Sequence, residues 1–289
     1  MTSIGLIGVG YIGKLFVDRL LDAEYPLVVY DISDEQMAYA TENGATAASH
    51  PAELAEETDI VVMALPGTPE VEDTLEGDNG LLETIESGQL VIDVTTTHPD
   101  TAVACEDIFD ERNIDFIEAL ITGGAPREGY HMMIGGTEAA YTRASEILSV
   151  MCDDHIRVGP IPDASILKLG LQMRYAGHHA IDAEVIEFVR DNGVDPTLFT
   201  DFFGFDMWEN YFSGDFSQDI EGLGGLAIWN KDIGYACDFA HQQKTALPLT
   251  GVVHEAYKAT TRRTSEDEGH ASSLIKYWLA LNNSEDRYE

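Results

Sequence analysis

Short apolar runs alternate with amphipathic, acidic segments through the first half of the chain. The apolar runs are rich in β-branched residues and are bounded by turn residues, which is typical of buried strands. They cover residues 4–9, 27–31, 59–66, 90–96, 114–120 and 131–136. The segments with helical spacing cover residues 11–24, 33–44, 51–57, 101–113 and 137–151. Strands that alternate with helices predict a Rossmann-type, doubly wound parallel sheet.

The hydrophobic pattern changes after residue 162. Strand-like runs disappear, and a long helical pattern over residues 163–193 opens the second half. The stretch GPIPD at residues 159–163 holds two prolines and an aspartate of the kind that begins a helix. The sequence therefore predicts an α/β protein, with a Rossmann domain over residues 1–162 followed by an all-α domain over residues 163–289.

Composition narrows the class of protein. Hydrophobic residues make up 44% of the 289 positions, which is enough for a buried core and argues against disorder. The apolar runs are too short to span a bilayer, and no charged and apolar leader precedes the first strand. Cys105, Cys152 and Cys237 stand far apart, so they indicate neither a disulfide framework nor a zinc site. We therefore expect a cytoplasmic protein that contacts no membrane.

The formal net charge of −36 comes from 52 acidic residues against 16 lysines and arginines. The acidic residues are scattered over the predicted helix exteriors and form no single tail. Two interpretations remain open: solvation of a halophilic protein in high salt, which screens the repulsion, or an acidic surface for a basic partner. The scattering favours the halophilic interpretation. A field of this sign excludes direct binding of nucleic acid, because phosphates need cationic side chains.

A glycine pattern follows the first predicted strand and opens the first predicted helix. Residues 8–13 read Gly-Val-Gly-Tyr-Ile-Gly, a GxGxxG fingerprint in the context that gives this motif its meaning. Gly8 is expected to allow a tight turn, Gly10 to let the backbone approach a pyrophosphate, and Gly13 to bring helix and strand close. The helix N-terminus then faces the phosphates of a dinucleotide.

Asp31 ends the second predicted strand, 18 residues after Gly13. A carboxylate at this position can accept hydrogen bonds from the ribose hydroxyls and repels a 2′-phosphate. Ile32 and Ser33 follow it, and no arginine does. The alternative is that Asp31 only caps the next helix. The pattern favours NAD over NADP.

Two further strand ends carry small polar groups. Thr95 and Thr96 follow one strand, and Thr122, Gly123 and Gly124 follow the next. Ligands bind at the carboxyl edge of a doubly wound sheet, where these residues are expected to meet. Hydroxyls and glycine backbone N–H groups are donors suited to a carboxylate, so we expect a small anionic substrate there.

A lysine stands near the start of the long helix in a chain that is poor in this residue. The six lysines are Lys14, Lys168, Lys231, Lys244, Lys258 and Lys276. On a helix, Lys168 shares one face with Gln172, Tyr175 and His179. A second, apolar face is formed by Ile166, Leu169, Met173 and Ala176. Lys168 is interpreted as the proton-transfer group of a dehydrogenase. The alternative is that it extends along the helix into solvent.

These residues together resemble the β-hydroxyacid dehydrogenase family, which includes 3-hydroxyisobutyrate dehydrogenases and tartronate semialdehyde reductases. The family's G-x-G-x-M-G pattern matches residues 8–13, with Ile12 at the methionine position. Its L-P pair matches residues 65–66. Its D-x-S-T-x-x-P pattern matches residues 93–99, with Thr95 at the serine position. The resemblance covers nearly the whole chain.

The substrate side of the pattern matches less closely. The family's D-A-P-V-S-G-G stretch matches residues 118–124, where Glu118 and Leu120 replace the aspartate and the proline. The asparagine expected four residues after the catalytic lysine is Gln172. The stretch after residue 124 is shorter than usual and contains Arg127. These departures leave the reaction class standing and the identity of the substrate open.

The resemblance implies an NAD-dependent oxidoreductase that transfers hydride between nicotinamide and a small β-hydroxy acid or its semialdehyde. It places the catalytic lysine at Lys168 and implies a homodimer or homotetramer. The expected substrate-binding residues are Thr95, Thr122, Gly123, Gly124 and Gln172. The expected cofactor-binding residues are Gly8, Gly10, Tyr11, Ile12, Gly13, Asp31, Leu65, Pro66, Thr96 and Lys231. Lys231 has a second interpretation as part of a surface ion pair, and no metal site is expected.

Three other functions stay open at this point. A 6-phosphogluconate dehydrogenase would carry a glycine-asparagine-serine signature where this chain has VTTTHP at residues 94–99. An imine-reducing member of the superfamily would lack the lysine at position 168. A non-catalytic NAD-binding protein would keep the fingerprint without turning over hydroxy acids.

Overall fold

The computed structural model describes residues 2–123, 128–205, 207, 209–214, 225–263 and 271–284. The chain forms two compact units, Met1–Lys168 and Leu169–Glu289. Helix α7 (Asp163–Asp191) begins in the first unit and continues into the second. The domain boundary that the sequence places at residue 162 stays a prediction.

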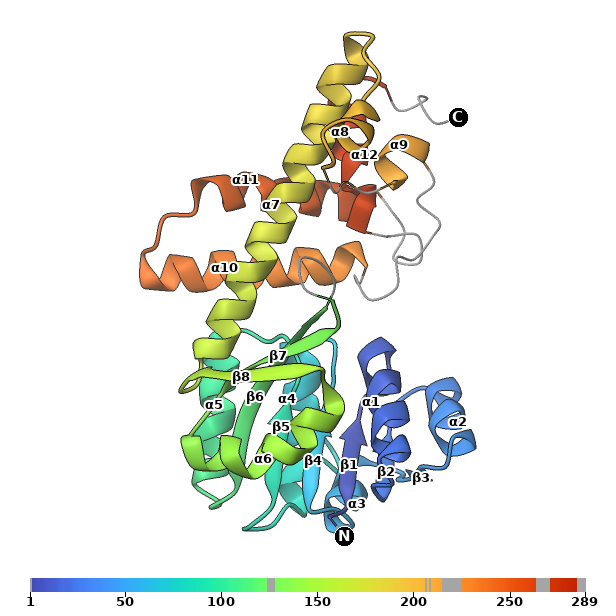
Figure 1. The fold of residues 1–289 in the computed structure, drawn as a ribbon. Helices are drawn as coiled ribbons and strands as arrows, with labels where there is room; N and C mark the ends of the chain where they lie inside the picture. The colour runs from blue at the N-terminus through green and yellow to red at the C-terminus, as the bar shows by residue number, and fades with distance from the viewer. Residues whose placement is uncertain are drawn as a thin grey trace. The chain divides into compact units, whose positions relative to one another are not determined.

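The first unit is built on a sheet of eight strands in the order β3-β2-β1-β4-β5-β6-β7-β8 (Figure 1). The strands are β1 (Ile4–Ile7), β2 (Leu27–Tyr30), β3 (Thr46–Ala47), β4 (Ile60–Met63), β5 (Leu90–Asp93), β6 (Asp115–Gly123), β7 (Tyr130–Gly135) and β8 (Asp154–Gly159). The chain moves outward from β1 in one direction and then resumes on the other side at β4. The carboxyl ends of β1 and β4 therefore flank the point where a doubly wound sheet binds its ligand.

The predicted fold class is confirmed, with one correction to the expectation of an entirely parallel sheet. β6 and β7 pair antiparallel, with Glu118 opposite Gly135 and Gly123 opposite Tyr130. Only residues 124–129 connect the two strands, and a parallel pair needs a crossover of a dozen or more residues. The periodicity also missed β3, which has two residues, and β8, whose polar residues hide its alternation.

Helices cover both faces of this sheet. They are α1 (Tyr11–Asp22), α2 (Asp34–Glu42), α3 (Pro51–Glu56), α4 (Thr68–Glu76), η1 (Leu81–Glu83), α5 (Pro99–Asp110) and α6 (Glu138–Met151). Phe16 of α1 and Leu148 of α6 pack with one set of strand side chains, and Leu54 of α3 and Phe109 of α5 pack with the other. Burying a side chain of this size stabilises the fold by about 1.5–3 kcal/mol, so two apolar layers hold the strand ends in place.

The second unit is helical, as predicted for the part of the chain that the structure describes. Its elements after α7 are α8 (Leu198–Asp201), α9 (Asn210–Ser213), α10 (Leu226–Gln243), α11 (Pro248–Thr261), η3 (Ala271–Leu274) and α12 (Ile275–Leu281). Trp229 of α10 stacks on Tyr257 of α11 with ring centroids 6.4 Å apart, in a core that includes Leu274. Within the described ranges, no helix is both long enough and apolar enough to cross a bilayer.

Candidate active site

The glycine fingerprint connects β1 to α1, and each of its three glycines has a distinct environment. Gly8 has a φ of +92°, and a Cβ there would lie 2.3 Å from the carbonyl oxygen of Ala64. A Cβ on Gly13 would lie 2.1 Å from the carbonyl oxygen of Gly8. A Cβ on Gly10 would meet no atom within 4 Å. Packing therefore requires Gly8 and Gly13, whereas Gly10 leaves open surface that a ligand can approach.

Helix α1 begins directly after Gly10. Among the described residues, no side chain caps it there, and its first turn contains no acidic residue. Backbone N–H groups at the start of a helix attract an anion, so this end can receive phosphates. Tyr11, the first helical residue, has its hydroxyl 2.8 Å from the hydroxyl of Tyr130. Ile12 packs against the core below. The cofactor expected from the sequence fits this loop.

Asp31 lies beside the same loop. Its carboxylate accepts hydrogen bonds from the backbone N–H of Val9 at 2.6 Å and of Ser33 at 2.8 Å. The cap of α2 is Ser33, so the alternative that Asp31 only caps the next helix is wrong. Asp31 instead links the end of β2 to the fingerprint. Ile32, next in the chain, is 93% exposed. A carboxylate held at this position suits the hydroxyls of a ribose.

The ends of β4 and β5 are tied together by Thr95. Its hydroxyl oxygen accepts a hydrogen bond from the N–H of Leu65 at 3.0 Å, and its own N–H donates to the Asp93 carboxylate at 2.9 Å. Thr95 is 3% exposed, while Thr96 beside it is half-buried. Thr95 therefore has a structural contact as well as its predicted role toward substrate. Pro66 follows Leu65 directly after this tie.

The end of β6 supplies the next part of the site. Thr122 and Gly123 are its last residues, and both are half-buried. A Cβ on Gly123 would lie 3.0 Å from the ring of Tyr130, so this glycine lets the ring approach the backbone. Gly124, the third predicted residue of this stretch, lies outside the described residues.

Lys168 reaches the same end of β6 from the first turns of α7. Its Nζ donates a hydrogen bond to the carbonyl oxygen of Ile121 at 2.9 Å, and the residue is only 8% exposed. The side chain therefore does not extend into solvent. The carbonyl that holds the amine belongs to the residue before Thr122. The structure thus brings together the predicted catalytic lysine and one of the predicted substrate residues.

Glu118 is a buried residue of this region for which no role was predicted. It lies on β6 and is 2% exposed. Its carboxylate accepts hydrogen bonds from the backbone N–H groups of Ala164 and Ser165 and from the Ser165 hydroxyl, in the first turn of α7. Burial raises the pKa of Glu118 above its ordinary value, and the hydrogen bonds from Ser165 and Ala164 oppose that rise. Its replacement of the family aspartate was the signal in the sequence.

In the second unit, Gln172 and Lys231 share a partner. The Gln172 amide nitrogen donates to Asp232 Oδ2 at 2.7 Å, and Lys231 Nζ lies 3.2 Å from Asp232 Oδ1. Asp232 is 1% exposed. The ion pair of Lys231 is therefore not a pair between two solvated side chains. The resembled family carries a late K-D pair that matches Lys231 and Asp232, and this match was the only sign of Asp232 in the sequence. No cluster of three metal-ligating side chains occurs in the described part of the chain.

The amino-acid sequence matches a family of known proteins. The model of the NAD-binding domain of 6-phosphogluconate dehydrogenase matches residues 3–159. The mitochondrial 3-hydroxyisobutyrate dehydrogenase of Mus musculus is 27% identical over 272 residues, covering 89% of this chain and 81% of that protein. The L-threonate dehydrogenase of Cupriavidus necator is 28% identical over 290 residues, covering 96% and 97%.

Solved structures share the fold. A 3-hydroxyisobutyrate dehydrogenase of Mycobacterium tuberculosis, solved with L-serine, superposes with a TM-score of 0.83 at 20% identity, covering 96% of this chain and 99% of that one. At this identity the likeness concerns the fold. The shared fold explains why the carboxyl ends of β1, β4, β5 and β6 lie along one edge of the sheet, next to the fingerprint loop.

Proposed function

The chain belongs to the β-hydroxyacid dehydrogenase family of NAD(P)-dependent oxidoreductases. From this premise we propose that it transfers hydride between NAD and a small β-hydroxy acid or the corresponding semialdehyde, using Lys168 as the general acid/base. The observation that carries the proposal is the buried amine of Lys168, held 2.9 Å from the Ile121 carbonyl oxygen beside Thr122. A proton-transfer group must be fixed within reach of the reacting hydroxyl, and a solvated lysine would not be.

The dinucleotide is proposed to lie on the fingerprint loop. Gly10 supplies the open backbone, the start of α1 supplies N–H groups for the phosphates, and Asp31 accepts from the ribose hydroxyls. The side chain at position 32 is an isoleucine, which offers no charge to a 2′-phosphate, so NAD is proposed over NADP. Leu65, Pro66, Thr96 and Lys231 keep their predicted roles in cofactor binding. The bound nicotinamide supplies the hydride acceptor.

Lys168 is proposed to move the proton. In the direction of oxidation, its neutral amine takes the proton of the substrate hydroxyl while the hydrogen on carbon departs as hydride. In the direction of reduction, its ammonium returns that proton to the new alkoxide oxygen. The carbonyl oxygen of Ile121 accepts a hydrogen bond from Nζ in either form and fixes the direction of the side chain.

The anionic head of the substrate is proposed to bind at the strand ends. Thr122 and the Gly123-Gly124 backbone offer donors, and the Thr95 hydroxyl retains a proton after it accepts from Leu65. Gln172, with its amide nitrogen on Asp232, keeps the predicted role toward substrate. The relatives' names indicate 3-hydroxyisobutyrate and threonate as the acids to try first.

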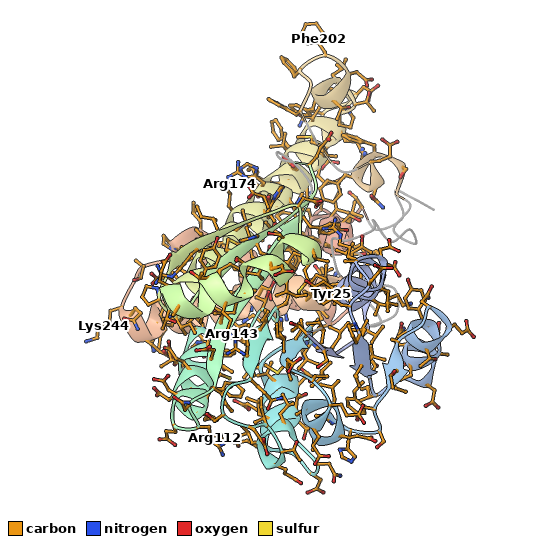
Figure 2. The ribbon with its side chains drawn as sticks, turned by 60° about the horizontal axis from the view of Figure 1, so that its bottom comes forward. Tyr25, Arg112, Arg143, Arg174, Phe202 and Lys244 are labelled. Carbon is orange, nitrogen blue, oxygen red and sulfur yellow. The ribbon has the colours of Figure 1, made fainter. Side chains whose placement is uncertain are left out.

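A homodimer or homotetramer in the cytoplasm of a halophile is proposed as the working state. The second unit carries an exposed cluster of aromatic side chains, Phe202, Phe203 and Phe205, and Phe202 is 77% exposed at its surface (Figure 2). The ring centroid of Phe203 lies 5.1 Å from that of Phe202 and 6.1 Å from that of Phe205. Apolar surface of this kind favours contact with another copy, more so in concentrated salt.

The test is a substrate panel followed through NADH absorbance in molar potassium chloride. The panel holds 3-hydroxyisobutyrate, glycerate, 3-hydroxypropionate, threonate and sulfonated analogues, with NAD and NADP in parallel. The proposal predicts turnover of at least one carboxylate with NAD. Silence on every acid, together with intact NADH binding, would instead identify a non-catalytic binding protein. 6-Phosphogluconate with NAD or NADP, and a cyclic imine with NADH or NADPH, are assayed beside the panel, and turnover of one of them alone would favour the corresponding alternative function.

A further inference from the structure

We propose that Glu118 is a positioning residue for Lys168: its buried carboxylate fixes the first turn of α7 to β6, so that the lysine meets the carbonyl of Ile121. The inference rests on the proposed function of Lys168. It adds a residue that touches neither substrate nor cofactor and acts through the lysine.

The contacts of Glu118 account for the start of α7. The first four backbone N–H groups of a helix have no partner inside the helix. Two of them, on Ala164 and Ser165, donate to the same oxygen of Glu118 at 2.9 and 3.2 Å. The Ser165 hydroxyl donates to the other oxygen. A carboxylate on the sheet therefore does for α7 what a capping residue of the helix itself usually does.

The lysine contact lies one step further along both elements. Glu118 and Ile121 are three residues apart on β6, and Ser165 and Lys168 are three residues apart on α7. The strand and the helix are consequently joined at two successive points, first by the carboxylate and then by the amine. If the first contact is lost, the start of α7 can shift on the sheet, and Lys168 shifts with it.

The neighbouring strands leave room for this arrangement. Gly135 lies opposite Glu118 on β7, and a Cβ there would come within 2.3 Å of Glu118 Oε1. Gly159, the register partner of Gly135 on β8, would place a Cβ only 1.9 Å from the carboxylate of Asp163, the first residue of α7. Two adjacent glycines thus make space for the two carboxylates at the start of the helix.

Burial of the Glu118 carboxylate makes the stability of the protein depend on pH, and this dependence can be measured separately from kcat. Burial raises the pKa of Glu118 above its ordinary value of 4.5. Because the folded pKa exceeds the unfolded one, the contribution of this group to stability is fully present below about pH 4.5 and is lost as pH rises through the folded value. A glutamine at this position does not titrate, so the variant does not lose this stability as pH rises. We therefore expect Glu118→Gln to fold, with a melting temperature that rises relative to wild type as pH increases above 4.5.

The test is a double-mutant cycle on turnover. Glu118→Leu, which removes both acceptor oxygens, is expected to lower kcat by about tenfold to a hundredfold, the range for a displaced catalytic group, and to leave the NADH dissociation constant unchanged. Glu118→Gln, whose amide oxygen still accepts from the N–H groups of Ala164 and Ser165, is expected to retain most of the wild-type kcat. In the Lys168→Ala background Glu118→Leu is expected to change the residual kcat by less than about twofold, because it acts only through the lysine. Glu118→Asp, which keeps a carboxylate, is expected to recover part of the lost kcat.

The outcomes are distinguishable from those of the proposed function. An equal fold-loss in both backgrounds, or no loss in the wild-type background, overturns the role of Glu118 and leaves Lys168 untouched. A Lys168→Ala enzyme with normal turnover refutes the proposed function instead, whatever Glu118 does. If Glu118→Leu does not fold, Ser165→Ala removes one of the three donors and is used in the same cycle, with a smaller expected loss of kcat in the wild-type background only.

Discussion

Gly10 and Gly13 belong to one fingerprint, but replacing each by alanine is expected to change a different property. Gly10→Ala is expected to weaken NADH binding, and Gly13→Ala is expected to lower stability. At Gly10 the new Cβ has no atom within 4 Å, and the backbone, at φ −67° and ψ −160°, is open to any residue. Gly10→Ala is therefore expected to keep or slightly raise stability, by up to about 1 kcal/mol through the unfolded chain. The same methyl occupies the surface proposed for the pyrophosphate, so the NADH dissociation constant is expected to rise at least about tenfold.

At Gly13 the new Cβ would lie 2.1 Å from the carbonyl oxygen of Gly8. That oxygen belongs to backbone that directly follows β1 and is held by the hydrogen bond from the Gly8 N–H to the Tyr30 carbonyl oxygen of β2, so α1 has to move away. Overpacking of this kind costs about 1–3 kcal/mol. In a protein of this size each kcal/mol shifts the melting temperature by about 2–4 °C, which gives a fall of several degrees for Gly13→Ala.

The assay pairs differential scanning fluorimetry without cofactor with NADH fluorescence titration, both in molar potassium chloride. The reasoning predicts that Gly10→Ala melts with wild type and binds NADH weakly, whereas Gly13→Ala melts early. Wild-type NADH affinity in a stable Gly10→Ala protein would refute the assignment of Gly10 to cofactor approach. A Gly13→Ala protein that melts with wild type would refute the packing argument.

Three other predictions follow from single contacts. Asp31→Ser removes the carboxylate that accepts from the Val9 and Ser33 N–H groups and that is proposed to accept from the ribose. The kcat/KM for NAD divided by that for NADP is therefore expected to fall about tenfold or more. An unchanged ratio would contradict the role of Asp31. Asp232→Asn removes the charge that pairs with Lys231 and alters the acceptor of Gln172, so KM for the acid is expected to rise about tenfold. Circular dichroism is expected to show that the helical unit stays folded. An unchanged KM would contradict the role of Gln172 in the substrate site. Phe202→Asp is expected to lower the assembly state in sedimentation velocity, since it introduces a charge into the exposed aromatic cluster, and Lys244→Asp, on an exposed residue outside that cluster, serves as the control.

The sequence was sufficient for the parts of the fold that depend on regular patterns. Strands buried on both faces read as continuous apolar runs, and the glycine fingerprint has a fixed spacing, so the sheet and the cofactor loop were predictable. The antiparallel β6–β7 pair was not, because apolar periodicity carries no strand direction. The short connection over residues 124–129 was the usable signal.

On the lysine helix, periodicity predicted burial only in part. Of the predicted apolar face, Leu169 and Ala176 are buried, but Ile166 is 42% exposed. Lys168 and Gln172, on the predicted polar face, are buried. Burial of polar residues on a helix depends on partners elsewhere in the chain, here Ile121 and Asp232, which spacing alone does not reveal. Glu118 and Asp232 were missed for the same reason.

The central claim is that one buried amine transfers the proton, and replacing it tests this directly. Lys168→Ala is compared with Lys258→Ala, which alters an exposed surface lysine of α11, for kcat on the best acid of the panel and for NADH affinity. The account predicts that Lys168→Ala loses about a hundredfold or more in kcat with NADH affinity intact, while Lys258→Ala matches wild type. Near-normal kcat in Lys168→Ala with full NADH binding would contradict it.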